Sequence, residues 1–253
     1  MKKIIYAVGV ALIFSACQSK KMDENKNDST STSTAPPVVA PVQLTEQQKT
    51  EGWKLLFDGV SKTGWRTFKN KPNDSWEVID GTLHCKPFKD SVENQRADLV
   101  TVDQYDNFEL AFDWKISSQG NSGVMFRVSE EFDEPYATGP EYQILDDGGY
   151  PGEVLETNLS ATAYGVFEAK NKKLNPVGEW NQAKIIANGN HIEHWLNGQK
   201  VVDYEINSPE WKKRRDKGKW KDFPAYATMS KGYVDLQDHG NEVWFKNIMI
   251  KPL

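Results

Sequence analysis

The chain has 253 residues, a formal net charge of −5 and a pI of about 5.5. This balance gives no reason to expect nucleic acid as a partner, because no basic field dominates. Hydrophobic residues make up 38% and aromatic residues 11%, including nine Trp, which is enough for one sizeable core of roughly 200 residues.

The first 16 residues are typical of a secretory signal peptide. A basic start at residues 2–3 precedes an apolar run over residues 4–14 and small residues before Cys17. The run is too short to span a bilayer as a helix. Residues 14–17 resemble a bacterial lipobox, which implies cleavage before Cys17 and lipidation of that cysteine. The expected location is the cell envelope, at the outer membrane, facing the periplasm or the surface, with the lipid as the only membrane contact.

Residues 17–51 are predicted to form the lipidated cysteine and a tether. The stretch is rich in Ser, Thr, Asn, Lys and Pro and has no apolar periodicity, which favours a flexible linker. Lys20 to Glu24 resembles the export signal of Bacteroidota surface lipoproteins. Thr45 and Gln48 resemble a capping box and indicate a short helix at the end of the tether.

Lipidation of Cys17 would leave Cys85 as a single cysteine, so no intrachain disulfide is expected. Cys85 follows His84, and such a pair can form a Cys-His site. A buried structural thiol is the simpler interpretation, because free cysteines are among the most buried residues.

Residues 52–253 are predicted to form one all-β domain. Apolar and polar residues alternate over residues 107–116, which indicates a half-buried antiparallel strand. Asn-Gly turns at residues 188–189 and 197–198 predict a three-stranded meander. The segment 208–222, rich in Lys and Arg, is expected to be a solvated helix or loop. Residues 76–84 are expected to form a hairpin around Asp80-Gly81, and residues 53–59 a strand that leads into a turn. Further strands are expected at residues 97–100, 121–128, 141–145, 163–167, 232–237 and 242–251.

The segment over residues 138–147 organises the domain. On a strand, Glu141 and Gln143 point to one face, and Tyr142 and Ile144 point to the other. A carboxylate and an amide would therefore share a polar face while the apolar pair packs into the core. Such a polar pair on a core strand indicates a candidate site.

The same alternation predicts a larger polar surface. If their strands are neighbours, five side chains converge on one concave face: Arg127, Glu141, Gln143, Gln237 and His239. Asn121 shares the side of Arg127. Asp146 would lie on the opposite face unless a bulge turns it inward. The alternative is that each is a satisfied polar residue on a solvated sheet face.

Several motifs, in this order, resemble the 3-keto-disaccharide hydrolase domain family: Leu56-Phe-Asp-Gly59, Gly64-Trp65, Asn121-Ser-Gly123, Gly139-Pro-Glu-Tyr-Gln-Ile-Leu-Asp146, Gly178-Glu-Trp-Asn181, His194-Trp-Leu-Asn-Gly198 and Leu236-Gln-Asp-His-Gly240. The resemblance covers residues 52–253. It implies a concanavalin A-like jelly-roll sandwich of two antiparallel sheets. It also implies a carbohydrate-active enzyme that cleaves glycosides whose sugar carries a ketone at C3.

The residues argue against ordinary retaining glycoside hydrolysis, which needs two carboxyl groups roughly 5 Å apart. The position two after Glu141 is Gln143, which can be neither nucleophile nor acid. A C3 ketone acidifies the C2 proton and opens a β-elimination route. Glu141 or His239 is then the expected base, and Arg127 or a divalent metal ion is the expected enolate stabiliser.

Asn121, Gln143, Asp146 and Gln237 are the expected substrate-binding residues, and the partner is an oligosaccharide or glycoside. Glu141, Asp146 and His239 offer ligands for a divalent metal ion, but no tight ligand spacing requires one. A non-catalytic, lectin-like surface lipoprotein needs the same polar face without a base, so it stays open as the alternative function.

Overall fold

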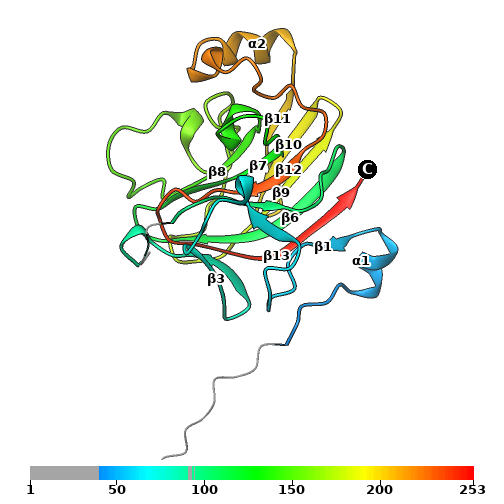
Figure 1. Ribbon diagram of the computed structural model, residues 1–253. Coiled ribbons are helices and arrows are strands. Elements are labelled where there is room, and N and C mark those ends of the chain that lie inside the picture. The colour runs from blue at the N-terminus through cyan, green and yellow to red at the C-terminus, as the bar shows by residue number, and fades with distance from the viewer. Residues whose placement is uncertain (1–39, 91–92, 94) are drawn as a thin grey trace, which may run out of the picture. The chain divides into compact units, whose positions relative to one another are not determined.

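The computed structural model describes residues 40–90, 93 and 95–253 (Figure 1). The predicted signal peptide, Cys17 and the first part of the tether lie outside these residues and stay predictions. None of the described helices has both the length and the apolar character needed to cross a bilayer.

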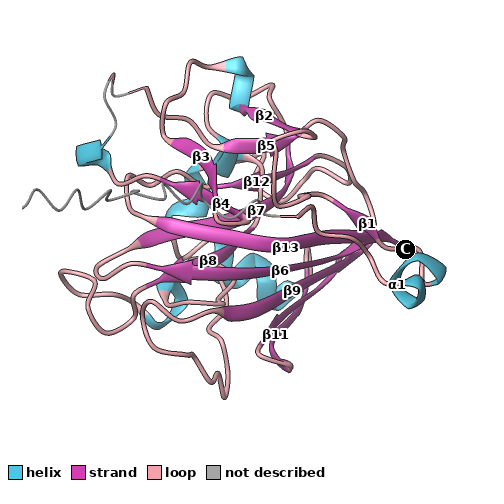
Figure 2. Ribbon diagram, turned by 90° about the horizontal axis from the view of Figure 1, so that it is seen from below, coloured by secondary structure: helices cyan, strands magenta, loops and turns pink. Residues whose placement is uncertain are grey.

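The described chain forms two antiparallel sheets that pack face to face, which confirms the predicted all-β sandwich (Figures 1 and 2). The larger sheet has the order β11 (Gln199–Glu205), β10 (His191–Leu196), β9 (Asn181–Asn188), β6 (Phe108–Ile116), β13 (Val243–Pro252), β4 (Thr82–Cys85) and β3 (Trp76–Ile79), and β1 (Lys54–Leu55) pairs with β13. The smaller sheet has the order β2 (Trp65–Thr67), β5 (Leu99–Thr101), β12 (Tyr233–Leu236), β7 (Asn121–Val128) and β8 (Glu141–Leu145).

Helices are short and lie in the connections. They are α1 (Glu46–Thr50), η1 (Phe68–Asn70), η2 (Phe88–Asp90), η3 (Pro135–Ala137), η4 (Glu156–Asn158), α2 (Pro209–Arg215) and η5 (Lys219–Asp222).

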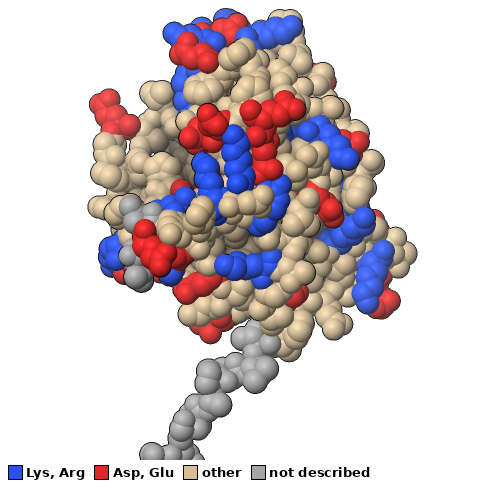
Figure 3. All heavy atoms as spheres, in the orientation of Figure 1, with Lys and Arg blue, Asp and Glu red and all other residues tan. Residues whose placement is uncertain are grey.

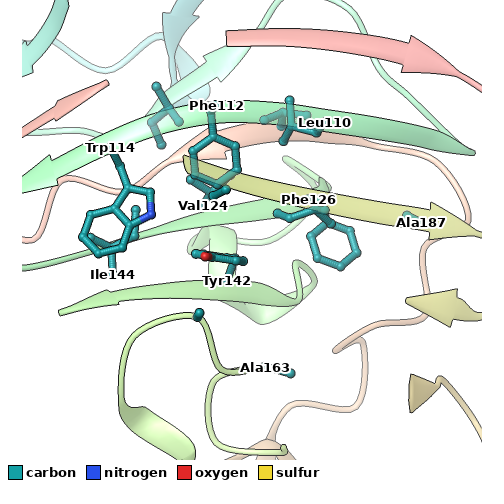
Figure 4. Close-up of a cluster of buried hydrophobic side chains, with 14 of the residues drawn as sticks. Leu110, Phe112, Trp114, Val124, Phe126, Tyr142, Ile144, Ala163 and Ala187 are labelled. Atoms are coloured by element: carbon teal, nitrogen blue, oxygen red, sulfur yellow. The ribbon is translucent and has the colours of Figure 1, made fainter. Parts of the chain in front are cut away.

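Alternate residues of facing strands fill the space between the sheets. Along β6, every second residue is buried, as the sequence pattern predicts. The ring of Phe112 on β6 meets that of Tyr142 on β8 edge to face, with centroids 5.6 Å apart (Figure 4). Phe108 and Phe126 pack in the same way at 6.0 Å. The predicted meander is confirmed as β9, β10 and β11.

The end of the predicted tether packs against the domain. Helix α1 forms with the expected capping box between Thr45 and Gln48. The backbone N–H of Val42 donates to the carbonyl of Asp58 at 2.8 Å, and the amide of Gln48 contacts the sulfur of Met249 at 3.5 Å. Residues 40–51 therefore belong to the folded unit and not to a free linker.

Two segments differ from their predictions. Residues 163–167 form isolated bridges in a tight loop instead of a strand. The basic segment 208–222 forms α2 and η5, but it is not wholly solvated, because Trp211 and Trp220 are buried. Trp220 stacks on Tyr226 with centroids 4.0 Å apart. The charged residues of this segment therefore surround an aromatic anchor that fixes it to the sandwich.

Cys85 is buried with a free thiol, as expected, and burial raises its pKa above the ordinary value. The adjacent His84 points the other way. Its two ring nitrogens lie 2.9 Å from Glu77 and 3.0 Å from Glu242, and its ring stacks on Trp244. The neighbours in sequence therefore lie on opposite faces of β4 and form no Cys-His site.

Charges of both signs are interspersed on the face seen in Figure 3. Ion pairs join many charges of the described residues: Lys200 contacts Glu193 at 3.1 Å, and Arg214 contacts Glu168 at 2.9 Å. Opposite charges at such spacing largely cancel at a distance, so this face presents no extended field of a single sign.

The packing of residues 40–51 predicts a stability difference between two shortened chains. A chain that begins at residue 53 should melt several degrees below one that begins at residue 40, because it loses the Val42 hydrogen bond and the contacts of α1. One hydrogen bond contributes about 1 kcal/mol, and about 1 kcal/mol shifts the melting temperature of a domain of this size by about 2–4 °C. Equal melting temperatures in calorimetry would show that residues 40–51 do not stabilise the folded unit and belong to the tether.

Candidate active site

The polar face lies on three adjacent strands, β12, β7 and β8. Gly123 pairs opposite Gln143, and Met125 pairs opposite both Glu141 and Asp235. Directly opposite residues in a sheet point to the same side, so Glu141, Gln143 and Asp235 share the face that is turned away from the core. The alternate residues of β8 are buried between the sheets, which is the strand parity predicted from the sequence.

A small pocket of about 150 Å³ opens above this face. Five predicted site residues line it: Asn121, Glu141, Gln143, Gln237 and His239. Three aromatic and basic side chains that the sequence did not single out complete the lining: Tyr136, Tyr164 and Lys219. Pockets for drug-sized ligands usually measure about 300–1,000 Å³, so this one suits a group of about the size of a single sugar ring.

Gly123 makes room for the carboxyl group of Glu141. A Cβ atom added at Gly123 would overlap Oε1 of Glu141 and crowd its Cγ and Cδ atoms. The side chain of Glu141 therefore extends from β8 across the surface of β7, and only a glycine at the facing position permits this. The motif Asn121-Ser-Gly123 provides both this glycine and one amide of the pocket.

The carboxyl group of Glu141 is buried without a neutralising contact. The residue is 4% exposed, and no hydrogen bond or ion pair within the described chain reaches its carboxyl oxygens. Burial raises its pKa to about 8, which the charge of Lys219 moderates and that of Asp98 reinforces. A buried charge without partners is costly, so Glu141 holds a proton at neutral pH and can release it within the physiological range.

Lys219 lies among aromatic rings at the wall of the pocket. Its Nζ atom is 4.3 Å from the ring centroid of Trp220, 4.5 Å from that of Tyr164 and 5.3 Å from that of Tyr136. Such cation–π contacts hold an ammonium group in place. Partial burial lowers the pKa of Lys219, and the nearby Glu141 raises it. The pocket thus combines one proton-transfer group with one fixed positive charge.

Amide groups form the floor beside Glu141. Nε2 of Gln143 donates to Oδ1 of Asn121 at 3.3 Å and to the carbonyl of Asn158 at 3.2 Å, while Oε1 accepts from the backbone N–H of Ile144. These contacts fix the orientation of Gln143. Amides fixed in this way can pair with sugar hydroxyls without a large loss of side-chain entropy.

Arg127 does not join the pocket, which corrects the predicted convergence. Its φ angle is +54°, a left-handed conformation that is uncommon outside glycine, and the β7–β12 register shifts close to it. The alternation therefore breaks before Arg127. Its guanidinium donates to the carbonyls of Asp106 at 2.8 Å and Gly189 at 2.8 Å, so Arg127 ties two connections together.

Asp146 is also outside the pocket lining. It follows β8 and accepts hydrogen bonds from the backbone N–H groups of Gln119 at 2.8 Å and Gly149 at 2.8 Å. The side chain therefore organises the turn after the strand. An unbulged strand places it away from Glu141, as its parity indicated.

The three residues considered as metal ligands, Glu141, Asp146 and His239, do not form a compact ligand set. Among the described residues, one group of three such side chains has its ligand atoms within 4.8 Å of one another: His191, Glu193 and Asp203. This group lies on β10 and β11 of the larger sheet, where Lys200 already pairs with both acids.

Asp235 is a buried acidic residue on the same sheet face as Glu141, and the sequence did not single it out. It is fully buried on β12, and neither carboxyl oxygen has a hydrogen-bond partner among the described residues. Burial and the nearby acids Asp98 and Glu141 raise its pKa well above the ordinary value. Burial of Asp235 therefore favours the neutral form of its carboxyl group.

A larger hollow of about 520 Å³ lies on the outer face of the eight-stranded sheet, among β6, β9, β10 and β13. Asp113 is the one acidic side chain of its lining, and it accepts a hydrogen bond from Asn247 at 2.7 Å. Its lining also includes Lys184, whose Nζ atom is 4.4 Å from the ring centroid of Trp195, but Asp113 is hydrogen-bonded, whereas the carboxyl group of Glu141 has no such partner among the described residues. Its size alone does not make it a reaction site.

The raised pKa of Glu141 predicts a pH-dependent effect of Glu141→Gln on stability. Between the ordinary pKa of 4.5 and about 8 the folded chain keeps a proton that the unfolded chain releases, so the contribution of Glu141 to stability falls as pH rises through this window. The variant lacks this loss. It should gain stability relative to the natural chain between about pH 5 and 8, by at most a few kcal/mol. A difference in urea-unfolding free energy that stays constant with pH would contradict the raised pKa.

Comparisons with known proteins agree with this architecture. Residues 52–251 match the family model for a 3-keto-alpha-glucoside-1,2-lyase-like domain. The chain is 28% identical over 292 residues to a 3-keto-disaccharide hydrolase from Bacteroides thetaiotaomicron, and the match covers 100% of both.

Two crystal structures of candidate glycosyl hydrolases from Parabacteroides distasonis are similar. One is 39% identical with a TM-score of 0.76 and covers 83% of this chain and 98% of its own. The other is 27% identical with a TM-score of 0.59 and covers 79% and 99%. The chain therefore belongs to the family of 3-keto-alpha-glucoside-1,2-lyase-like domains and is a carbohydrate-active protein of the glycosyl hydrolase type.

Proposed function

We propose that this protein cleaves the glycosidic bond of 3-keto-glycosides, including 3-keto-disaccharides, by β-elimination at the Glu141 pocket. The main support for this proposal is the buried carboxyl group of Glu141, which has a pKa of about 8 and shares a sugar-sized pocket with the ammonium group of Lys219. The family model and the name of the Bacteroides relative supply the substrate class.

The substrate makes this chemistry accessible. A ketone at C3 acidifies the proton on C2, and the glycosidic oxygen on C1 is then in the β position. Removal of the C2 proton gives an enolate, and collapse of the enolate breaks the C1–O bond and leaves a C1–C2 double bond. Water added across this double bond yields the free 3-keto sugar, so the net reaction is hydrolysis.

Glu141 is the base in this scheme. General bases work best when their pKa lies near the working pH, and burial brings that of Glu141 to about 8. At pH 7 roughly a tenth of the population carries the charge. The charged form lies over Gly123 on the pocket floor, where the C2 proton of a bound ring is accessible.

Lys219 takes the role that the sequence suggested for Arg127. Its ammonium group is fixed by aromatic rings and interacts electrostatically with Glu141. A positive charge held beside the C3 oxygen would stabilise the enolate at the moment it forms, and such preorganised electrostatics is usually the largest single contribution to catalysis.

The lining also explains why the two-carboxylate mechanism of ordinary glycosidases is disfavoured. Glu141 provides the one carboxyl group among the residues that line this pocket. The next position of β8 on the same face is Gln143. A nucleophile and an acid at roughly 5 Å are therefore missing from this lining. The fixed amides of Asn121 and Gln143 suit hydrogen bonding to sugar hydroxyls instead.

The variant Glu141→Gln distinguishes the proposed enzymatic function from a lectin-like binding function. It keeps the shape and one acceptor but removes the base, and general acid–base catalysis typically contributes about 10²–10⁴-fold. Turnover of methyl 3-keto-glucoside should therefore fall at least about 10²-fold, while calorimetric binding of the same sugar should weaken far less. Glu131→Gln, an exposed glutamate outside the pocket, is the matched control and should keep full turnover.

Full activity of Glu141→Gln would remove Glu141 from the mechanism and favour His239 as the base. A natural chain that binds the sugar but never turns it over would support the lectin-like alternative. Melting temperatures measured on the same samples distinguish both outcomes from loss of the fold.

A further inference from the structure

A second small pocket opens beside the first. It measures about 180 Å³ and is lined by Phe68, Lys71, Arg96, Ala97, Asp98, Glu134, Pro135 and Asp238. Two elements serve both pockets. Helix η3 contributes Pro135 to the second pocket and Tyr136 to the first. The segment that directly follows β12 contributes Asp238 to the second pocket and Gln237 to the first. The two pockets are therefore neighbours on one sheet face.

The sheet register places Asp98 and the carboxyl group of Glu141 on opposite sides of Gln237. Leu99 pairs with Leu236, so Asp98 comes opposite Gln237, and the backbone N–H of Gln237 donates to Gly123, over which Glu141 lies. Strands are about 4.8 Å apart, so two strand spacings give about 10 Å between the two acids.

The second pocket contains polar atoms that the fold leaves unused. Oδ1 of Asp98 accepts from the backbone N–H of Asp238 at 2.7 Å, whereas no hydrogen bond within the described chain reaches Oδ2. Arg96 donates through Nε to Asp238 at 2.9 Å, but its Nη1 atom is buried and has no hydrogen-bond partner among the described residues. Buried donors in native proteins are nearly always paired, so an oxygen-rich ligand would complete this site.

We propose that the second pocket receives the leaving group of the 3-keto-glycoside, the second sugar of a disaccharide, and that Asp98 donates the proton to the departing oxygen. This inference rests on the proposed function and supplies a second carboxyl group, which the lining of the first pocket lacks. With one ring in each pocket, the glycosidic oxygen lies at their boundary, between Glu141 and Asp98. Arg96 Nη1 and Lys71 then face the hydroxyls of the second sugar.

The scheme conserves protons over one catalytic cycle. Glu141 takes the C2 proton, the C1–O electron pair leaves with the oxygen, and Asp98 protonates that oxygen to give an alcohol. In the second half, water adds its oxygen to C1 and its proton to Asp98, while Glu141 returns a proton to C2. Both acids regain their starting state, and no other reactant is needed.

Ionisation of Asp98 is compatible with this role. Burial raises its pKa to about 7, against the hydrogen bond from Asp238 that lowers it. His239 at the rim of the first pocket is the competing acid, so a test must separate the two.

The test varies the leaving group. Methoxide must be protonated as it departs, whereas 4-nitrophenolate leaves readily as an anion. Asp98→Asn should lower kcat/KM for methyl 3-keto-glucoside by at least about 10²-fold and that for the 4-nitrophenyl 3-keto-glucoside by less than about threefold. Asparagine can still accept from Asp238, so the fold should persist. Asp133→Asn, an exposed aspartate outside both pockets, should leave both values unchanged.

An equal loss on both substrates, or a leaving-group-selective loss in His239→Asn but not in Asp98→Asn, would overturn the assignment of Asp98. If Asp98→Asn does not fold, Lys71→Ala tests the pocket: KM should rise for a 3-keto-disaccharide and not for the methyl glycoside, and an equal KM effect would reject it. A natural chain inactive on every substrate would reject the proposed function itself.

Discussion

The site depends on the burial of one carboxyl group over a glycine. Glu141 lies across Gly123 because the facing strand offers no Cβ there, and the same placement buries its carboxyl group without a hydrogen-bond partner among the described residues. Desolvation then raises its pKa to about 8, which makes the group a base near neutral pH instead of a permanent anion. Lys219 moderates this effect without eliminating it, so a proton-transfer group and a fixed cation coexist in one small pocket.

The sandwich is the scaffold that keeps this geometry rigid. The floor residues of the site alternate along β8 with side chains that pack against β6, so a shift of one residue in register would exchange the polar and apolar faces. Contacts such as Phe112 with Tyr142 make that shift costly. The wall is built differently, because Trp220 anchors η5 to the sandwich and thereby fixes Lys219 beside the floor.

Strand parity was sufficient to predict the floor of the pocket. The alternation of residues 107–116 and the parity of Glu141 and Gln143 depend only on local geometry. The approach of Gln237 and His239 depended on the condition that their strands are neighbours, which the order β12, β7, β8 meets. The wall could not be predicted in this way. Lys219 follows a run of surface charges, and only tertiary packing of Trp220 shows that it faces the site. The prediction for Arg127 was wrong because a positive φ angle at this residue breaks the strand alternation that the sequence indicated.

The central claim is that the enzyme removes the C2 proton before the glycosidic bond breaks. The most direct measurement uses a 3-keto-glycoside that carries deuterium at C2, with mass spectrometry of the released sugar and of the remaining substrate. Elimination predicts that deuterium passes to Glu141 and from there exchanges with water. The sugar released by the natural chain should therefore contain less deuterium than the same free sugar incubated with the Glu141→Gln variant. A released sugar that keeps its C2 deuterium in full, together with equal kcat/KM values for the deuterated and the unlabelled glycoside, would contradict the account and indicate direct displacement at C1.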